Sequence, residues 1–332
     1  SMLDVRAFKL WAALSGVVPR ISVVKGRCFA GNAVIAGCSD LIVATKDTSI
    51  GMGGPAMIAG GGLGDVHPDE VGPLTVQSPN GVVDVVVDDE QQAVAVAKRL
   101  IGYFQGTVET GDSADQTTLR TMIPERARRA YPVGPIIETL ADAGSVTFLR
   151  EKFAPEMAAR FLQLCDAFGL PVLSLVDCPG YMVGPAAEAD ALVRRASRML
   201  VAGAALRVPL VAVILRRGYG LGAQAMTGGS LHEPLLTVAW PNAHLGPMGL
   251  EGAVRLGLRK ELEAIPDEAA REEAVRHATA AAQENAKALN AAQIFEIDDV
   301  IDPAETRALV ASTFAAAMRE PLPPRRPVVD TW

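Results

Sequence analysis

The amino-acid sequence predicts an α/β layered fold made of two similar units in tandem. Short β-branched runs alternate with stretches of helical periodicity, the pattern of sheets covered by helices. In addition, one strand–turn–helix passage occurs twice, beginning Val-Pro-Arg-Ile-Ser-Val-Val at Val18 and Val-Pro-Leu-Val-Ala-Val-Ile at Val208. Each run leads into a glycine-rich turn and, further on, a second glycine cluster, at residues 26–33 and 49–55 in one copy and 218–225 and 245–252 in the other. The repeat predicts two similar sites lined by backbone.

The first half of the chain is expected to alternate helices and strands. Pro19 and Gly26 bound a short buried strand, and the acidic pair Asp88-Asp89 opens an amphipathic helix. Residues 52–79 hold many Gly, Pro and Asp and predict a long loop. The predicted elements are helix Asp4–Leu14, strand Ile21–Val24, a helix from about Asn32, strand Leu41–Ala44, strand Val82–Val87 and helix Glu90–Phe104.

The second half repeats this alternation after a linker. Turn formers and a charged run over Gln105–Val133 predict the linker, and we place the two units at residues 1–132 and 133–332. The predicted elements are a helix of about Pro155–Phe168, strand Val172–Val176, a helix of about Glu188–Ala202, the second strand–turn–helix copy, a charged helical stretch over Leu256–Leu289 and a helix near Ala304–Met318.

Composition argues against several functional classes. Aromatic residues make up only 5%, too few for a platform that stacks single-stranded bases. The formal net charge of −7 argues against a surface that coats a polyanion. No apolar run is long enough to span a membrane, and the four cysteines and four histidines lack metal-site spacing. We therefore expect no nucleic-acid, membrane or metal partner, and free thiols in a reducing cytoplasm.

The two glycine-rich turns are the strongest candidate sites. Small residues at Ala30-Gly31 and at Leu221-Gly222 let a ligand carbonyl approach the main chain. The N–H groups of a helix N-terminus have no intrahelical acceptor, and two of them can form an oxyanion hole worth about 3 kcal/mol per donor. The alternative is that these glycines only permit tight strand–helix packing.

Three further features invite a functional interpretation. Residues 177–184 follow a strand's carboxyl end, where α/β folds place ligands, although they could form an ordinary turn. Arg216-Arg217 and Arg194-Arg195 could hold phosphates or be solvated surface. His244, beside the second glycine cluster, could be catalytic or structural. The sequence contains no Gly-x-Ser-x-Gly, P-loop or Rossmann fingerprint.

At these residues the chain resembles a known family, the carboxyltransferase (beta) subunit of biotin-dependent acyl-CoA carboxylases of the acetyl-/propionyl-CoA carboxylase type, within the crotonase superfamily. The resemblance covers most of Ser15–Met318 and implies two crotonase-like ββα-superhelix units in tandem. The segments that carry it are Ser15–Gly26 with Cys28–Asn32, Cys165–Tyr181, and Arg217–Ala223 with Ala239–Ala253.

The resemblance implies roles for the turns. The backbone amides of Ala30 and Gly31 would hold the biotin ureido oxygen, and those of Leu221 and Gly222 the thioester enolate oxygen of an acyl-CoA. Biotin on a carrier and the coenzyme A thioester would be the reacting groups, and no side-chain base would be needed. We expect acyl-chain selectivity to depend on residues behind the second hole and substrate to contact the flanking turns: Gln224, Ala225 and Met226 for selectivity, and Gly53, Gly54, Gly180, Tyr181, Gly246 and Met248 for contact.

The same resemblance implies partners. Relatives form dimers or hexamers in which the first half of one subunit and the second half of another share an active site, and they work with a biotin carboxylase and a biotin carrier. The family's first unit begins upstream of Ser1, and opening strands are also expected near 146–152. Each unit is thus incomplete at its start, and we expect the sequence to be a fragment or to show only ordered residues, which an intact mass other than 34.8 kDa would reveal.

Two other functions stay open at this point. The chain could be a different crotonase-type acyl-CoA enzyme, such as a decarboxylase, hydratase or isomerase. A hydratase needs a carboxylate beside the thioester, for which Glu188, Asp190 and Glu251 are the candidates. The chain could also be a non-catalytic scaffold that binds a biotin carrier. The acyl group cannot be inferred from the residues.

Overall fold

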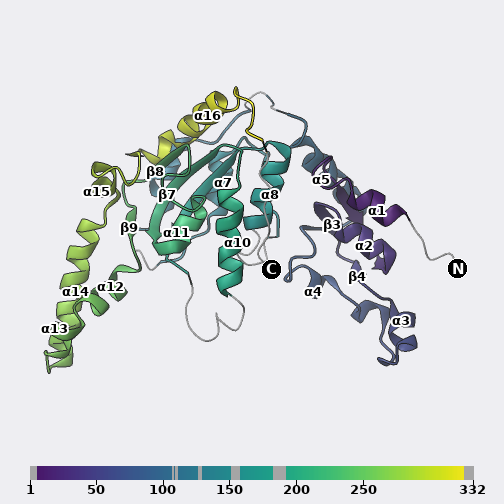
Figure 1. Cartoon of the computed structure of the whole chain (residues 1–332), viewed down its shortest axis with the longest axis horizontal. Helices are drawn as coiled ribbons and strands as arrows, with labels where there is room; N and C mark the ends of the chain where they lie inside the picture. The colour runs from purple at the N-terminus through teal and green to yellow at the C-terminus, as the bar shows by residue number, and fades with distance from the viewer. Residues whose placement is uncertain are drawn as a thin grey trace. The chain divides into compact units, whose positions relative to one another are not determined.

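The computed structural model describes residues 6–106, 108, 111–125, 129–150, 158–181 and 192–324 (Figure 1). The chain divides into two compact units, residues 1–110 with 147–157 and residues 111–146 with 158–332. Both units are α/β, with parallel sheets, which confirms the predicted fold class. The boundary after residue 132 stays a prediction.

The first unit contains a three-stranded parallel sheet and a separate two-stranded pair. Strands β1 (Ile21–Val24), β3 (Leu41–Thr45) and β5 (Val85–Val87) lie in the order β1-β3-β5. Strands β2 (Arg27–Phe29) and β4 (Ser49–Gly51) pair in parallel beside them. Every residue of β3 is buried, as expected for a parallel strand covered on both faces.

The helices of the first unit correct one prediction. They are α1 (Ala7–Ala12), α2 (Gly31–Gly37), α3 (Pro55–Gly60), α4 (Leu74–Gln77) and α5 (Glu90–Gly102), with a 3-10 turn at Pro68–Glu70. The long loop predicted over 52–79 is wrong, because its prolines begin short helices: Pro55 is the first residue of α3 and Pro73 caps α4. Asp89 caps α5 as expected, its carboxylate accepting from the N–H of Gln92 at 2.8 Å.

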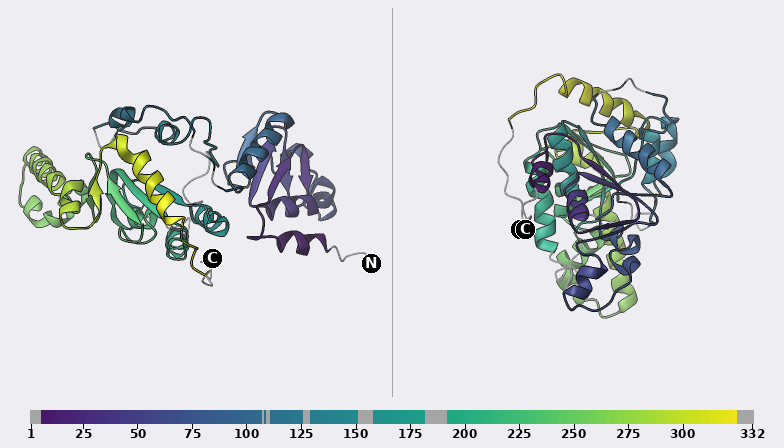
Figure 2. Two further views of the ribbon diagram at one scale, coloured as in Figure 1. Left: turned by 90° about the horizontal axis from the view of Figure 1, so that it is seen from above. Right: turned by 90° about the vertical axis from the view of Figure 1, so that its right-hand side faces the viewer.

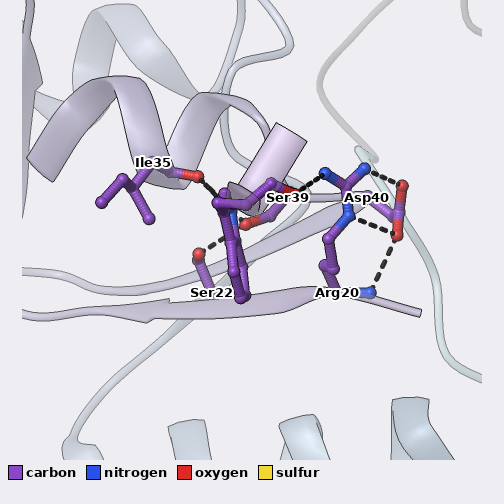
Figure 3. Close-up of polar contacts among 6 residues, drawn as sticks. Arg20, Ser22, Ile35, Ser39 and Asp40 are labelled. Carbon is purple, nitrogen blue, oxygen red and sulfur yellow. Dashed lines mark hydrogen bonds and ion pairs between the residues drawn. The ribbon is translucent and has the colours of Figure 1, made fainter. Parts of the chain in front are cut away.

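A buried ion pair fixes the entrance to this sheet (Figure 3). The guanidinium of Arg20 meets the carboxylate of Asp40 at 2.9 Å, and the same carboxylate accepts from the Arg20 backbone N–H at 2.8 Å. Arg20 also donates to the carbonyl of Trp11 in α1. The hydroxyls of Ser22 and Ser39 share a 2.7 Å hydrogen bond nearby. The starts of β1 and β3 are therefore tied to each other and to α1.

The second unit is organised around one long buried strand. Strands β6 (Val172–Cys178), β7 (Leu210–Tyr219), β8 (Leu236–Ala239) and β10 (Asp299–Val300) form a parallel sheet in the order β10-β8-β7-β6. The short β9 (His244–Gly246) pairs with the end of β7. Residues 211–215 of β7 are fully buried, so β7 is the core of the unit.

Helices cover this sheet, and three of them form an arm. In Figures 1 and 2, α12 (Leu250–Gly257) and α14 (Glu268–Asn285) extend from the strands side by side. Val254, Leu262 and Val275 form a small core of this arm. The helices are α6 (Leu119–Met122), α7 (Gly134–Leu140), α8 (Ala158–Phe168), α10 (Leu192–Ala204), α11 (Gly220–Met226), α12 (Leu250–Gly257), α13 (Arg259–Glu263), α14 (Glu268–Asn285), α15 (Ala288–Gln293) and α16 (Thr306–Ala317), with 3-10 turns at Gln116–Thr118 and Pro303–Glu305.

The linker predicted over 105–133 is wrong in its middle part. Leu119 and Ile123 are buried in the main core of the second unit, against Val211 and Trp240. The charged residues around them favoured the prediction of a linker, but a short helix, α6, lies there with Leu119 buried. Segment 111–125 is thus part of the second unit rather than a connection.

The predicted repeat is present in the strand register. Ile21 pairs with Leu41 as Val211 pairs with Leu236, and Phe29 pairs with Gly51 as Tyr219 pairs with Gly246 (190 residues separate Ile21 from Val211 and Phe29 from Tyr219). The same frame therefore equates Ala30 with Gly220, Gly31 with Leu221 and Asn32 with Gly222.

Candidate functional site

The candidate site of the second unit begins where β7 turns into α11. Gly220 adopts a φ of +60°, and a Cβ there would lie 2.8 Å from the carbonyl oxygen of Pro247. Only glycine fits this position without a shift of the backbone. Gly220, Leu221 and Gly222 form the first turn of α11, so their N–H groups lack the intrahelical acceptor that later residues have.

Gly222 packs on the turn that follows β6. A Cβ on Gly222 would lie 2.7 Å from Cys178 Sγ, 3.2 Å from the Gly180 carbonyl carbon and 3.3 Å from the Tyr181 nitrogen. The structure therefore brings the predicted residues Gly180 and Tyr181 to the first turn of α11. The Tyr181 hydroxyl is buried without a hydrogen-bond partner, and burial, with the neighbouring Cys178, raises its pKa.

The third side of this site is the turn after β9. Gly246 pairs with Tyr219, and a Cβ on it would contact the Tyr219 ring at 3.8 Å. Met248, two residues on, is 40% exposed. Leu221 is 61% exposed, so the surface at the first turn of α11 is open to a ligand.

The three residues predicted to select the acyl chain differ in their surroundings. Gln224 is exposed on the surface of α11. Ala225 is 1% exposed, and Met226 packs on the core cluster that includes Ala223 and Leu245. Gln224 is therefore the most exposed member of this set.

The first unit has its turn at the same position in the strand register, but the backbone N–H of Ala30, one of the two predicted donors, is already bonded. Ala30 adopts φ 54° and ψ −125°, and its N–H donates to the Gly51 carbonyl at 3.1 Å. That N–H is thus already bonded, and Gly31 is the first residue of α2. Gly31 lies beside α1, since a Cβ on it would be 3.0 Å from Phe8 Cζ.

Gly53 and Gly54 border the same turn. Gly54 caps α3, and a Cβ on it would lie 3.1 Å from the Phe29 ring, the last residue before Ala30. Gly249 caps α12 at the corresponding place in the second unit. The second glycine clusters therefore have equivalent positions in the two repeats.

The prediction for the arginine pair at the end of β7 is wrong for Arg216. Arg216 is 3% exposed, so it is not solvated surface. It pairs with Asp177 at 2.9 Å, and Arg217 pairs with the same carboxylate at 2.6 Å. No local sequence pattern predicts this cluster, because Asp177 lies 39 residues before Arg216.

The charges around Asp177 set its protonation. Burial alone would raise the pKa of this carboxyl, but the bond from Arg217, the adjacent Tyr131 hydroxyl and the two guanidinium charges lower it below its usual value. The Tyr131 hydroxyl is buried beside the carboxylate without a hydrogen bond of ordinary geometry, and burial raises its pKa. Arg216 also stacks on the Tyr131 ring, 4.6 Å from the centroid.

The acid–base candidates find little support. His244 is half-buried in β9, and burial lowers its pKa. Glu251 bonds to Arg255 at 3.2 Å, while Glu188 and Asp190 lie outside the described residues. The described residues contain no group of three His, Cys, Asp or Glu side chains able to bind a metal ion. Nor is any helix among them both long and apolar enough to cross a membrane.

Comparison with known proteins relates this geometry to one family. Residues 4–158 and 156–327 each match the family described as carboxyl transferase domain. The 12S subunit of methylmalonyl-CoA carboxyltransferase from Propionibacterium freudenreichii subsp. shermanii is 31% identical, over 90% of this chain and 64% of that subunit. The beta6 subunit of biotin-dependent acetyl-/propionyl-coenzyme A carboxylase from Mycobacterium tuberculosis is 32% identical, over 94% of this chain and 74% of that subunit.

Solved structures agree with this relation. A single-chain, multi-domain long-chain acyl-CoA carboxylase matches with a TM-score of 0.89 and 47% identity, over 94% of this chain and 34% of that one. The hexameric transcarboxylase 12S, solved with methylmalonyl-coenzyme A and methylmalonic acid bound, matches with a TM-score of 0.85 and 27% identity, over 98% of this chain and 70% of that one. The chain therefore spans about a third of the single-chain carboxylase.

Proposed function

Because the chain belongs to the carboxyl transferase domain family, we propose that it is the carboxyltransferase component of a biotin-dependent acyl-CoA carboxylase. Its reaction would move a carboxyl group from carboxybiotin, presented on a carrier, to the α-carbon of an acyl-CoA. The observation that carries this proposal is the packing of Gly222 on the Cys178–Tyr181 turn. That contact brings the turn after β6 against the first-turn amides of α11, at the carboxyl end of the sheet, where α/β folds place ligands.

The first turn of α11 suits a thioester enolate. Loss of the α-proton puts negative charge on the thioester oxygen, and the N–H groups of Leu221 and Gly222 would stabilise it. Each such donor contributes about 3 kcal/mol. The enolate carbon then attacks carbon dioxide, which comes, like the acceptor of the α-proton, from the carboxybiotin substrate. The protein's part is to hold the enolate in place.

In the first unit, the donors that we propose for the biotin ureido oxygen lie one residue later than the pair implied by the resemblance. The Ala30 N–H is bonded to Gly51, and the strand register equates Leu221 and Gly222 with Gly31 and Asn32. We therefore assign the pair Gly31 and Asn32 to this role, with Ala30 shaping the turn. A neutral ureido oxygen fits such a site because it accepts hydrogen bonds from unpaired first-turn amides.

Identity to relatives supports a long acyl chain as the substrate. The chain is 47% identical to the long-chain acyl-CoA carboxylase, against 27% to transcarboxylase 12S. Exposed Gln224, beside the proposed hole, is the residue we expect to contact the chain near the thioester. Gly53, Gly54, Gly246 and Met248 line the flanking turns in this proposal.

A substrate panel tests the function directly. The protein is incubated with carboxybiotin and with acetyl-, propionyl- or palmitoyl-CoA, and carboxylated acyl-CoA is measured by mass spectrometry. Palmitoyl-CoA should give the highest kcat/KM. Carboxylation of short acyl-CoA alone would overturn the chain-length assignment, and the absence of product with every acyl-CoA would overturn the function.

The remaining expectations concern partners and place. Transcarboxylase 12S forms a hexamer, which supports a dimer or hexamer here, with a biotin carboxylase and biotin carrier as partners. The four cysteines are free thiols, which supports a reducing cytoplasm. Light scattering of the purified protein would test the assembly, since a monomer at assay concentration contradicts it.

A further inference from the structure

A bulge in β7 lies directly before the proposed enolate site. Val176 pairs with Ile214, and Cys178 pairs with Gly218, so β7 advances four residues while β6 advances two. The extra residues of β7 must be held by something other than the ladder. Bulges redirect a strand and increase its twist, and they are frequent beside active sites.

The Asp177 side chain holds this bulge with both carboxylate oxygens. Oδ1 accepts from the Arg217 backbone N–H at 3.2 Å and from its Nε at 2.6 Å. Oδ2 accepts from Arg216 Nη2 at 2.9 Å and Nε at 3.2 Å. Arg216 Nη1 in turn donates to the Arg129 carbonyl at 2.9 Å. The carboxylate thus binds one backbone N–H at the bulge, that of Arg217, and holds the side chains of both arginines.

The residues next to this cluster are those of the site. Cys178 follows Asp177, and Gly218 follows Arg217 and leads into the turn at Gly220. Cys178 Sγ and the backbone of Gly180 and Tyr181 touch Gly222 so closely that a Cβ has no room. A change in the spacing of β6 and β7 at Asp177 would therefore change the spacing of the turn and the first-turn amides.

We infer that Asp177 is a positioning residue that sets the geometry of the enolate site by fixing the bulge in β7. The inference deepens the proposed function and rests on it, since the proposed function identifies the group bound at this site as an enolate. Asp177 does not touch substrate in this account. It acts through Arg217 and Cys178, and an error of 1 Å in such a site costs about 100-fold in rate.

The first repeat supports this role because it makes the equivalent bend without an ion pair. The residue equivalent to Arg216 is Gly26, which has a φ of +66°. There the strand breaks between β1 and β2, and glycine makes the bend by itself. The second repeat has arginine at that place, so the bend depends on the ion pairs to Asp177.

A second buried pair in the same unit provides a matched control. Asp166 accepts from the Arg207 backbone N–H at 2.7 Å and from its Nε at 3.1 Å, and its side chain is as buried as that of Asp177. This pair lies just before β7, at the end of the strand away from the site. Loss of either pair should lower the midpoint of thermal unfolding, but only Asp177 should affect catalysis.

The experiment compares Asp177→Asn with Asp166→Asn in the full chain. Asp177→Asn should lower kcat for acyl-CoA carboxylation by about 10- to 100-fold while KM changes little. Asp166→Asn should keep kcat. Arg217→Gln, which removes one of the bonds to Asp177 and leaves Arg216 in place, should give a smaller loss of kcat and serves if Asp177→Asn does not fold.

A second readout does not depend on activity. Cys178 is partly buried, with its Sγ against Gly222, and its alkylation by iodoacetamide is followed by peptide mass spectrometry. The rate should rise in Asp177→Asn and Arg217→Gln but not in Asp166→Asn. Wild-type rates of alkylation and turnover in both variants would overturn the inference. An inactive wild-type protein whose Cys178 rate still rises in the variants would instead refute the proposed function and leave Asp177 as a positioning residue.

Discussion

The two repeats share a hydrogen-bonded frame yet differ at the turns of the two candidate sites. The Ile42 N–H donates to the Asp84 carboxylate at 2.7 Å, and the Thr237 N–H donates to the Asp298 carboxylate at the same distance. The left-handed turn residue, by contrast, is Ala30 in one repeat and glycine in the other. The shared hydrogen bonds therefore give both repeats the same chain path, while the residue at the left-handed turn position determines the backbone strain of each turn.

The same comparison separates two ways of making one bend. Glycine at position 26 reaches a left-handed φ and needs no support. Arg216 keeps the strand continuous and is supported by Asp177. The bend in the second repeat is supported by side chains of both β6 and β7, so it links the candidate site to β6. The described residues of the first repeat contain no such link.

The largest expected difference concerns the ion pairs at the strand entrances. Arg20→Ala leaves the Asp40 carboxylate buried without its partner and should cost about 3–5 kcal/mol of unfolding free energy. Arg207→Ala should cost less, about 2 kcal/mol, because that side chain is more exposed, 18% against 4%. Denaturant unfolding measures both. The exposed pair of Arg276 with Glu273 is the control, and a larger loss on removing it would contradict this order.

The next effect is on catalysis and distinguishes the two proposed oxyanion holes. Gly222→Ala places a methyl group 2.7 Å from Cys178 Sγ and should lower kcat by about 100-fold as the turn moves away. Gly31→Ala meets only the tip of the exposed Phe8 side chain, which a change of χ1 can move aside, so its loss should be smaller. Gly257→Ala, in open space, is the control. Equal losses at residues 31 and 222 would refute the steric argument.

A reciprocal exchange at the turn residues should give a smaller effect. Gly220→Ala forces alanine into a left-handed conformation against the Pro247 carbonyl and should cost at least about 1–2 kcal/mol. Ala30→Gly removes an existing strain and should stabilise the protein by up to about 1 kcal/mol. Thermal unfolding of the two variants should therefore shift in opposite directions, and shifts of the same sign would show that the turns are not equivalent.

The smallest effect is a pH dependence present in one repeat. Burial lowers the pKa of His244 from 6.5, against the opposing bond to Asn242. The unfolded chain then binds this proton more tightly than the folded one, so stability falls as pH drops below 6.5. His244→Asn should lose this component, which thermal unfolding between about pH 5 and about pH 7.5 would detect. Ser49, the equivalent residue in the first repeat, does not titrate.

Much of the frame could be predicted because its signals are local. Ile21–Val24 is a strand with the predicted bounds, and β-branched residues between Pro19 and Gly26 are sufficient to indicate it. Helices α3 and α4, of six and four residues, are too short to show helical periodicity and were predicted as loop. The segment around Leu119 was predicted as linker because its burial depends on residues far along the chain.

The site was predictable in part for the same reason. Glycine clusters located both turns, and Gly180 and Tyr181 do lie beside Gly222. The repeat that begins at Val18 and Val208 already carries the 190-residue offset of the strand register. The candidate pairs Ala30-Gly31 and Leu221-Gly222 depart from that offset by one residue, because small residues and not the offset located them. The Asp177 cluster joins two strands whose pairing no local pattern encodes, so only the fold could reveal it.

The arm of the second repeat has a consequence for how such chains change length. The Leu245 N–H bonds to the Ala286 carbonyl as the Ile50 N–H bonds to that of Gly72, both at 2.8 Å. Between these points the second repeat carries α12–α14, with a core of their own, where the first has a shorter excursion. Since the chain leaves and rejoins the sheet at matching bonds, we expect the length of the arm to be free to change while β7 and β9 keep their register.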